Sequence, residues 1–259
     1  MTRYTSAFRQ HGLTPDEIPQ FSSGQTPQSD EKLSFKTGRR KTDQKTNDNQ
    51  VKKFEKEYAN YIAKKDHLKA FGCLEKILLL QPNSYFGFLR EGDIFHHLKR
   101  DDEALKSYDR CIELNKKDGR AQNNMGNLFT SKKQFKKAIK CFEESNKYDP
   151  KSPVGWRNLG DALDELGRHK KAIDFGYDEA IRLDKKSTSA WFGKAWALWG
   201  LDQYKEAVEC FNEAIRLDKK WVLSWNNKGR CHYSLGQYKK AIECYDEAIG
   251  LIKNGNIHG

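Results

Sequence analysis

The sequence predicts an all-α fold of tandem antiparallel helix pairs, and three recurring features lead to this prediction. An alanine recurs at intervals of 34, 34, 34, 35 and 34 residues, at Ala70, Ala104, Ala138, Ala172, Ala207 and Ala241. Apolar residues recur twice within each interval at i, i+4 and i+7, which is the spacing of one helix face. A glycine or alanine also returns in the first predicted helix of five intervals. Six units of two helices each follow from this periodicity.

The units are predicted to span residues 51–84, 85–118, 119–152, 153–187, 188–221 and 222–255. The first helix of five units carries a large aromatic residue at the same repeat position, where unit three has Gln122 instead: Phe54, Phe88, Trp156, Trp191 and Trp225. Four residues later the small residue follows, at Gly92, Gly126, Gly160, Ala195 and Gly229, whereas unit one has Tyr58. Because a glycine inside a helix costs about 1 kcal/mol relative to alanine, we expect these positions to lie against a neighbouring helix.

In the second helix of each unit a large residue follows the repeated alanine four positions later, except in unit four, where the spacing is five. There Phe175-Gly176-Tyr177 makes the interval one residue longer. An inserted residue rotates the rest of a helix by about 100°, yet Ala180 and Ile181 remain in register with the next unit. We therefore predict a π-bulge near Phe175 and Gly176. Such a bulge either adjusts the pitch of the repeat array or serves a function.

Residues 1–50 are rich in Ser, Thr, Gln, Asn, Asp and Pro and are predicted to form a disordered N-terminal tail. They carry too little apolar surface to offset the entropic cost of ordering. Within this tail, residues 13–21 offer Thr14 as an N-cap and Pro15 at the first helical position. This segment is a docking peptide, folds back onto the repeats, or is unstructured. Residues 256–259 are expected to form a short C-terminal tail.

Two stretches show the repeat most completely. Trp156-Arg157-Asn158-Leu159-Gly160 is followed by Gly167, Ala172-Ile173 and Ala180-Ile181-Arg182-Leu183-Asp184, and Trp225-Asn226-Asn227-Lys228-Gly229 is followed by Gly236-Gln237-Tyr238, Ala241-Ile242-Glu243-Cys244-Tyr245 and Ala248-Ile249. In these residues the chain strongly resembles the tetratricopeptide repeat (TPR) family, in six tandem copies. The resemblance implies a right-handed superhelical solenoid whose first helices line a concave groove. The usual terminal proline is present only at Pro82 and Pro150.

No enzyme is predicted, and therefore no catalytic residue, cofactor or metal site. The sequence has no Gly-rich phosphate loop, nucleophile motif or carboxylate pair at catalytic spacing. Four of the six cysteines, Cys73, Cys141, Cys210 and Cys244, each lie three residues after the repeated alanine. At that position a small residue packs between helices, so we expect these thiols to serve packing rather than redox or metal chemistry.

The first helices carry the residues from which we predict a partner-binding groove. Phe192, Trp196 and Trp199 share one face of the unit-five helix, and grouped exposed aromatic residues anchor many interfaces. In the alternative, curvature buries them between neighbouring first helices. Amides can hold an extended peptide and arginines can bind carboxylates. The predicted groove residues are Phe86, Arg90, Arg120, Asn123, Asn124, Asn127, Arg157, Asn158, Asp161, Phe192, Trp196, Trp199, Asn226, Asn227 and Arg230.

These residues predict a non-enzymatic scaffold or adaptor that binds a peptide or helical segment of a protein partner. Related co-chaperones bind the acidic C-terminus of heat-shock chaperones through a clamp of Lys and Asn across three units. The matching pairs in this chain are Glu55 with Ala59, Leu89 with Asp93, Asn123 with Asn127 and Arg157 with Asp161. None of them pairs Lys with Asn, so that specific activity is not expected.

Binding of RNA or single-stranded nucleic acid is the alternative function, because the chain carries a net charge of +11. Nine lysines also motivate this alternative: Lys132, Lys133, Lys136, Lys137, Lys140, Lys170, Lys171, Lys239 and Lys240. These lysines are predicted at the start of second helices and in turns, away from the aromatic residues. The sequence has no membrane-spanning run of about 18 apolar residues and opens without a secretory signal, so we expect a cytoplasmic protein.

The last predicted helix presents an apolar face that earlier units bury against the next hairpin. This face consists of Ile242, Tyr245, Ile249 and Ile252. Terminal repeats normally need a polar outer face or a capping helix. We therefore expect this face to associate with a second copy of the chain, with residues 13–21 or with a partner.

Overall fold

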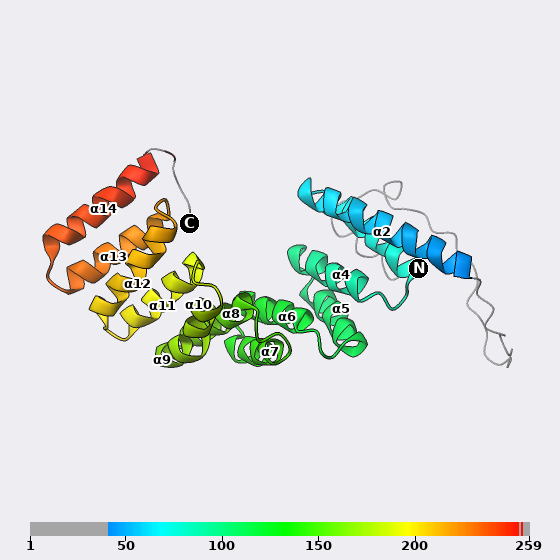
Figure 1. The fold of residues 1–259 in the computed structure, drawn as a ribbon, viewed down its shortest axis with the longest axis horizontal. Coiled ribbons are helices and arrows are strands. Elements are labelled where there is room, and N and C mark those ends of the chain that lie inside the picture. Colours follow the sequence, from blue (N-terminus) through cyan, green and yellow to red (C-terminus); the bar gives the residue numbers. More distant parts are fainter. Residues whose placement is uncertain (1–40, 254, 256–259) are drawn as a thin grey trace. The chain divides into compact units, whose positions relative to one another are not determined.

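A computed structural model describes residues 41–253 and Gly255 of the chain, with side chains from Thr46 onward (Figure 1). The helices from Gln44 onward belong to one compact unit. All elements in this described part are helices, which confirms the predicted all-α fold of helix pairs. The predicted docking segment at residues 13–21 and the C-terminal tail at 256–259 lie outside the described residues.

Each pair consists of a first and a second helix joined by a short turn. The pairs are α2 (Lys41–Ala63) with α3 (His67–Leu80), α4 (Tyr85–His97) with α5 (Asp101–Leu114), α6 (Arg120–Ser131) with α7 (Phe135–Tyr148), α8 (Pro153–Asp164) with α9 (His169–Ala172), η2 (Ile173–Tyr177) and α10 (Asp178–Leu183), α11 (Thr188–Gly200) with α12 (Tyr204–Leu217), and α13 (Val222–Ser234) with α14 (Tyr238–Lys253). The helix α2 begins ten residues before the expected tail boundary, so residues 41–50 are helical rather than part of a disordered tail.

The chain turns within each pair through one residue in the left-handed region of backbone space. These residues have φ between 56° and 71°: Lys65, Lys99, Lys133, Gly167, Asp202 and Gly236. Glycine adopts this conformation without a steric penalty, which explains Gly167 and Gly236 in the turns. The starts of α4 and α11 are capped by serines, since Ser84 Oγ accepts from Gly87 N (3.2 Å) and Ser187 Oγ accepts from Ala190 N (3.3 Å).

The aromatic and glycine positions of the first helices have separate packing roles. In three units the tryptophan Nε1 donates to a carbonyl oxygen six residues earlier, as Trp156 does to Pro150 at 2.9 Å. The glycines lie against the large residue of the second helix. A β-carbon on Gly92 or Gly229 would come within 3 Å of the ring of Tyr108 or Tyr245. The expected close approach is therefore confirmed, and it accounts for glycine inside these helices.

Unit four contains the predicted π-bulge, which spans Ile173–Tyr177 between α9 and α10. The extra residue is absorbed there, because Phe175 points outward and is 59% exposed while Tyr177 is buried. Gly176 faces Gly160 of α8 so closely that a β-carbon on Gly176 would overlap the Gly160 backbone. The bulge thus keeps Tyr177 in its repeat position with space for the additional residue.

First helices that follow one another are in contact along the chain, as α4 with α6, α6 with α8, α8 with α11, and α11 with α13. Each also packs against the second helix of the preceding unit, as α13 does against α12. The apolar core lies between first and second helices and centres on residues such as Phe142, Tyr177 and Phe211. No described helix is both long enough and apolar enough to traverse a lipid bilayer. The row of first helices is the surface on which the predicted groove residues lie.

Candidate functional site

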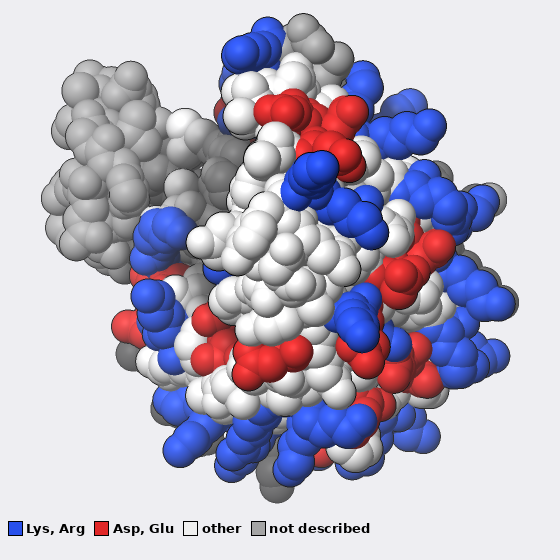
Figure 2. Space-filling view, turned by 90° about the vertical axis from the view of Figure 1, so that its left-hand side faces the viewer, with Lys and Arg blue, Asp and Glu red and all other residues white. Residues whose placement is uncertain are grey.

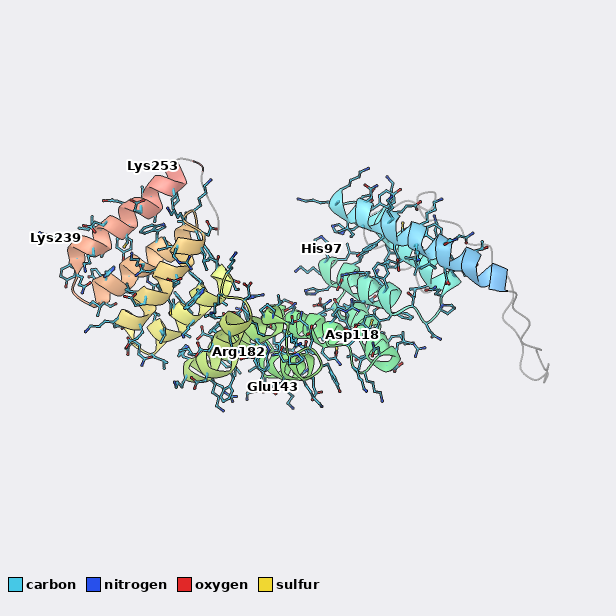
Figure 3. The ribbon with its side chains drawn as sticks, viewed as in Figure 1. His97, Asp118, Glu143, Arg182, Lys239 and Lys253 are labelled. Carbon is cyan, nitrogen blue, oxygen red and sulfur yellow. The ribbon has the colours of Figure 1, made fainter. Side chains whose placement is uncertain are left out.

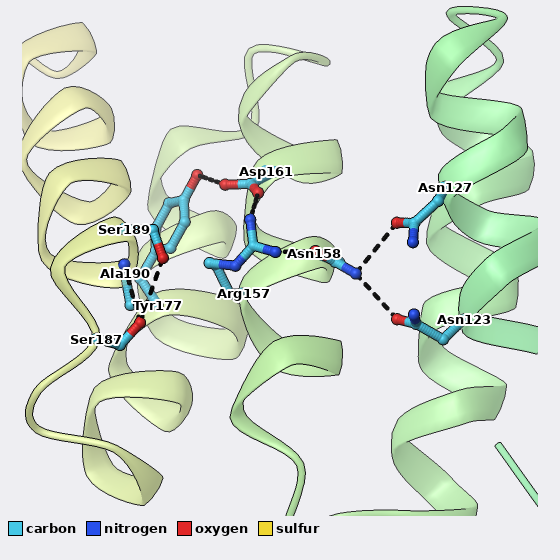
Figure 4. A network of polar contacts seen from close by, with 9 residues as sticks. All are labelled: Asn123, Asn127, Arg157, Asn158, Asp161, Tyr177, Ser187, Ser189 and Ala190. Atoms are coloured by element: carbon cyan, nitrogen blue, oxygen red, sulfur yellow. Dashed lines mark hydrogen bonds and ion pairs between the residues drawn. The ribbon is translucent and has the colours of Figure 1, made fainter. Parts of the chain in front are cut away.

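Asn158 joins the first helices of units three and four. Its Nδ2 donates to Asn123 Oδ1 at 2.9 Å and to Asn127 Oδ1 at 3.1 Å, both on α6 (Figure 4). Its own Oδ1 accepts from Arg157 Nη2 at 2.7 Å. Because Asn158 is buried, these hydrogen bonds satisfy an amide that has little access to water. Three of the predicted groove asparagines therefore bind one another, and Asn158 holds α8 to α6; that they hold a peptide stays a prediction.

Asp161 links the first and second helices of unit four. Its Oδ2 lies 2.8 Å from Arg157 Nη1, and its Oδ1 accepts from the Tyr177 hydroxyl at 3.0 Å (Figure 4). Burial raises the pKa of the Asp161 carboxyl, and the Arg157 charge opposes that rise. Burial, followed by the charge of Asp161, also raises the pKa of the Tyr177 hydroxyl. Arg157 is thus already paired within the chain.

Asp93 links the first and second helices of unit two in the same way, although it was not among the predicted groove residues. Its Oδ2 lies 2.9 Å from Arg90 Nη1, and its Oδ1 accepts from Tyr108 Oη at 3.0 Å and from Asn124 Nδ2 at 2.7 Å. Asp93 stands at the repeat position of Asp161. That shared position, with a tyrosine on the second helix of both units, was the sequence signal for this network.

The aromatic residues of α11 form two stacked pairs rather than one surface. Phe192 stacks on Trp221 at 5.1 Å between centroids and an interplanar angle of 13°. Trp196 stacks on Trp199 at 5.2 Å and 23°. Phe192 and Trp199 pack against the core, whereas Trp196 does not. Phe192, Trp196 and Trp199 are all half-buried, so burial between neighbouring helices, which was the alternative interpretation, applies in part to each of them, and Trp196 is the one that does not pack against the core.

Arg230 of α13 extends this aromatic cluster. Its guanidinium carbon lies 4.6 Å from the ring centroid of Trp199 and 5.4 Å from that of Trp196, within the range of cation–π attraction. Its Nη1 donates to Asn227 Oδ1 at 3.1 Å. Asn227 is itself buried and donates to Leu223 O at 2.9 Å. The helices α11 and α13 thus bring together Trp196, Trp199, Asn227 and Arg230, a set hereafter called the tryptophan–arginine site.

The other predicted groove residues lie outside this site. The ring of Phe86 meets that of Tyr58 edge to face, with 5.8 Å between the centroids, and Arg90 lies over the Phe86 ring. Arg120 stands at the start of α6, where it pairs with Asp118 at 2.6 Å and lies over the Tyr85 ring. Asn226 is exposed. The structure therefore separates a polar network in units two to four from an aromatic and basic site in units five and six.

The apolar face at the end of the described chain is open for three of its four predicted members. Ile242, Ile249 and Ile252 are 59%, 46% and 52% exposed. Tyr245 differs, because its ring lies against Gly229 within its own helix pair. Figure 2 views the α14 side and shows uncharged residues bordered by charges of both signs. Association of this face with a second copy, with residues 13–21 or with a partner stays a prediction.

The described residues contain no group of three or more His, Cys, Asp or Glu side chains suited to hold a metal ion. Every cysteine of the chain is free, and burial raises the pKa of each thiol, to about 12 for Cys111 and Cys231. Such thiols are poor nucleophiles at neutral pH, since the thiolate is the reactive form. Their surroundings are those of packing residues.

Family models described as tetratricopeptide repeat match residues 88–118, 119–152, 188–221 and 222–254. Anaphase-promoting complex subunit 3 of Schizosaccharomyces pombe is 24% identical over 57% of this chain and 22% of its own length. The peroxisomal targeting signal receptor of Kluyveromyces lactis is 30% identical over 36% of this chain and 16% of its own length. The chain therefore spans less than a quarter of these relatives.

Solved structures share the fold. The crystal structure of YrrB, described as a TPR protein with an unusual peptide-binding site, superposes with a TM-score of 0.58 at 22% identity, over 69% of this chain and 91% of YrrB. PilF of Pseudomonas aeruginosa gives a TM-score of 0.69 at 16% identity, over 77% of this chain and 90% of PilF. At these identities the likeness concerns the arrangement of helices.

Proposed function

The chain belongs to the tetratricopeptide repeat family, and on that basis we propose that it is a non-enzymatic scaffold that binds a peptide or helical segment of a protein partner along its first helices. The proposal assigns no catalytic residue, cofactor or metal to the chain. It places the main contact at the tryptophan–arginine site and treats the polar network of units two to four as the frame that orders the neighbouring helices.

The observation that carries this proposal is the stacked pair of Trp196 and Trp199 beneath Arg230. Tryptophan and arginine dominate the energetics of many protein interfaces because they combine large apolar area with directed hydrogen bonds. The site also joins two successive units, α11 and α13, so a bound segment would contact both. Trp196 is only half-buried and does not pack against the core, so part of its side chain can contact a ligand without unfolding.

The descriptions of two similar proteins support peptide binding as the class of function. One is a peroxisomal targeting signal receptor, and the YrrB structure is described as having a peptide-binding site. Both descriptions refer to recognition of a polypeptide segment. The match covers a small part of the receptor, so its particular signal is not transferred to this chain.

Affinity capture from a native lysate of the source cells tests the proposal. The bait is the full chain as wild type, as Trp196→Ala, and as Phe175→Ala, in which an exposed aromatic residue of η2, outside α11 and α13, is removed. We expect a set of proteins that wild type and Phe175→Ala retain and Trp196→Ala loses, with all three baits giving the same helical circular dichroism. An identical catch on Trp196→Ala and wild type would overturn the assignment of the site.

Nucleic-acid binding is the second candidate, and exposed lysines on the second helices favour it. Lys133 and Lys136 are exposed near α7, and Lys239 projects from α14 (Figure 3). However, Lys132 pairs with Asp101 at 3.2 Å and Lys170 with Asp174 at 3.0 Å, which reduces the free positive charge. Binding of a fluorescent oligouridine that falls steeply with salt concentration would favour this candidate. Absence of binding at low salt would exclude it.

A further inference from the structure

Arg230 is one of two arginines that have no acidic partner among the described residues. The described residues contain nine arginines, and seven of them lie within 4.0 Å of a carboxylate oxygen. The two others are Arg168, which is exposed, and Arg230, which is half-buried. Among the predicted groove arginines, Arg90, Arg120 and Arg157 are therefore neutralised within the chain. Among these four groove arginines, only Arg230 has no carboxylate partner in the described part of the chain.

The surroundings of Arg230 fix its guanidinium before any ligand arrives. Trp196 and Trp199 lie against it, and Asn227 accepts one of its N–H groups at 3.1 Å. Asn227 is held in turn by Leu223 O. A guanidinium carries five N–H donors, so most of them have no acceptor among the described residues. A group ordered in this way loses little rotamer freedom when a carboxylate binds, and arginine binds carboxylates through two parallel hydrogen bonds.

The position of Arg230 in the repeat makes the contrast with earlier units clear. The same position holds Asp93 in unit two and Asp161 in unit four. Those carboxylates accept from a tyrosine hydroxyl and from an arginine of their own helix. In unit six the position carries a donor instead of an acceptor. The surface of the first helices therefore changes from internally paired carboxylates to a free cation beside two indoles.

We propose that Arg230 binds a carboxylate of the partner segment while Trp196 holds an apolar side chain next to it. The ligand class is thus a peptide that presents an acidic group beside an apolar residue. The acidic group is an Asp or Glu side chain or a free C-terminus, since both offer the same carboxylate. This inference rests on the proposed function and specifies the chemistry of its ligand.

Selection from two synthetic random decapeptide pools tests the inference. One pool is amidated at the C-terminus and the other carries a free carboxylate, so the two sources of the acidic group are distinguished. The full chain is used as wild type, as Arg230→Gln and as Arg182→Gln, a control in which an exposed arginine of α10 already paired with Glu179 is changed. Circular dichroism verifies that all three fold alike.

We expect wild type and Arg182→Gln to enrich Asp and Glu in the amidated pool, or to prefer the free-carboxylate pool, and Arg230→Gln to lose the preference. For an individual selected peptide, replacing its acidic group by the amide should weaken its affinity for wild type about tenfold and leave its affinity for Arg230→Gln nearly unchanged. Peptides bound by wild type without any acidic preference would overturn the role of Arg230 and leave the scaffold function standing. If wild type binds no peptide from either pool, the proposed function itself is overturned.

Discussion

Val208 and Ile242 hold the same position in the second helices of consecutive units, yet Val208 is 8% exposed and Ile242 is 59% exposed. The difference arises because α13 covers this face of α12, whereas no described helix covers the face of α14. The repeat determines which residue faces the next unit, and the neighbour determines whether that residue is buried.

The first prediction follows from this difference. Val208→Ala should lower the free energy of unfolding by about 2 kcal/mol, because it removes buried methyl groups and leaves a cavity. Ile242→Ala should change it by less than about 0.5 kcal/mol, as for other surface substitutions. Urea unfolding followed by circular dichroism measures both. Equal losses in the two variants would mean that the α14 face is covered in solution.

The π-helical segment gives the second prediction. Gly176→Ala should destabilise the chain by about 3 kcal/mol or more, because the new methyl group would overlap the Gly160 backbone, which cannot move aside as a side chain can. Gly72→Ala is the matched control, since a β-carbon there meets no atom within 4 Å and alanine favours the helix by about 1 kcal/mol. The melting temperature should therefore fall for Gly176→Ala and rise for Gly72→Ala. A neutral Gly176→Ala would contradict the packing seen at Gly160.

The hydrogen bonds of Asn158 give the third prediction. Asn158→Ala should cost about 1–3 kcal/mol of stability, because the acceptors on α6 and the Arg157 guanidinium lose their buried partner. Asn226→Ala, at an exposed asparagine that was predicted for the same groove, should cost less than about 0.5 kcal/mol. Urea midpoints of the two variants make the comparison. Similar midpoints would show that these hydrogen bonds contribute nothing to holding α8 against α6.

The thiols give the fourth prediction. Burial raises the pKa of Cys141 and Cys210 to about 11, so about 0.1% of each is thiolate at pH 8, against about a quarter of a free thiol with pKa near 8.5. Ellman's reagent should therefore react at least about tenfold more slowly with the native chain than with the chain in urea, where all six thiols are accessible. Rapid titration of two or more thiols in the native chain would contradict the burial.

Asp118 gives the fifth prediction. Hydrogen bonds from the Arg120 side chain hold the pKa of this carboxyl below its usual value. A carboxyl whose pKa is lowered on folding stabilises the folded state at pH values above its unfolded pKa of about 3.9. This stabilisation is lost as the pH falls through the pKa of the folded state. Asp118→Asn should thus cost about 0.5 kcal/mol at pH 7, and the difference from wild type should shrink below about pH 4. A difference that stays constant with pH would exclude this charge interaction.

The sequence placed the predicted groove residues on first helices but did not reveal their partners within the chain. Asn123, Asn127 and Asn158 were predicted to hold a peptide, and in the structure they bind one another and join α6 to α8. Arg120 and Arg157 were predicted to bind carboxylates of a ligand, and they are paired within the chain with Asp118 and Asp161. Periodicity gives a residue's position on the helix, but a pairing depends on rotamers and on which side chains share that face.

The sequence by itself determined the helix pairs, the helical register and the π-bulge, because short helices must bury their apolar faces on neighbours and a one-residue insertion must be absorbed locally. The tertiary structure alone decided how the predicted groove residues are packed and paired. It places Phe192 and Trp199 against the core, and it gives Arg230 no carboxylate partner among the described residues. Burial and charge pairing depend on distances between units, and a single repeat does not contain those distances.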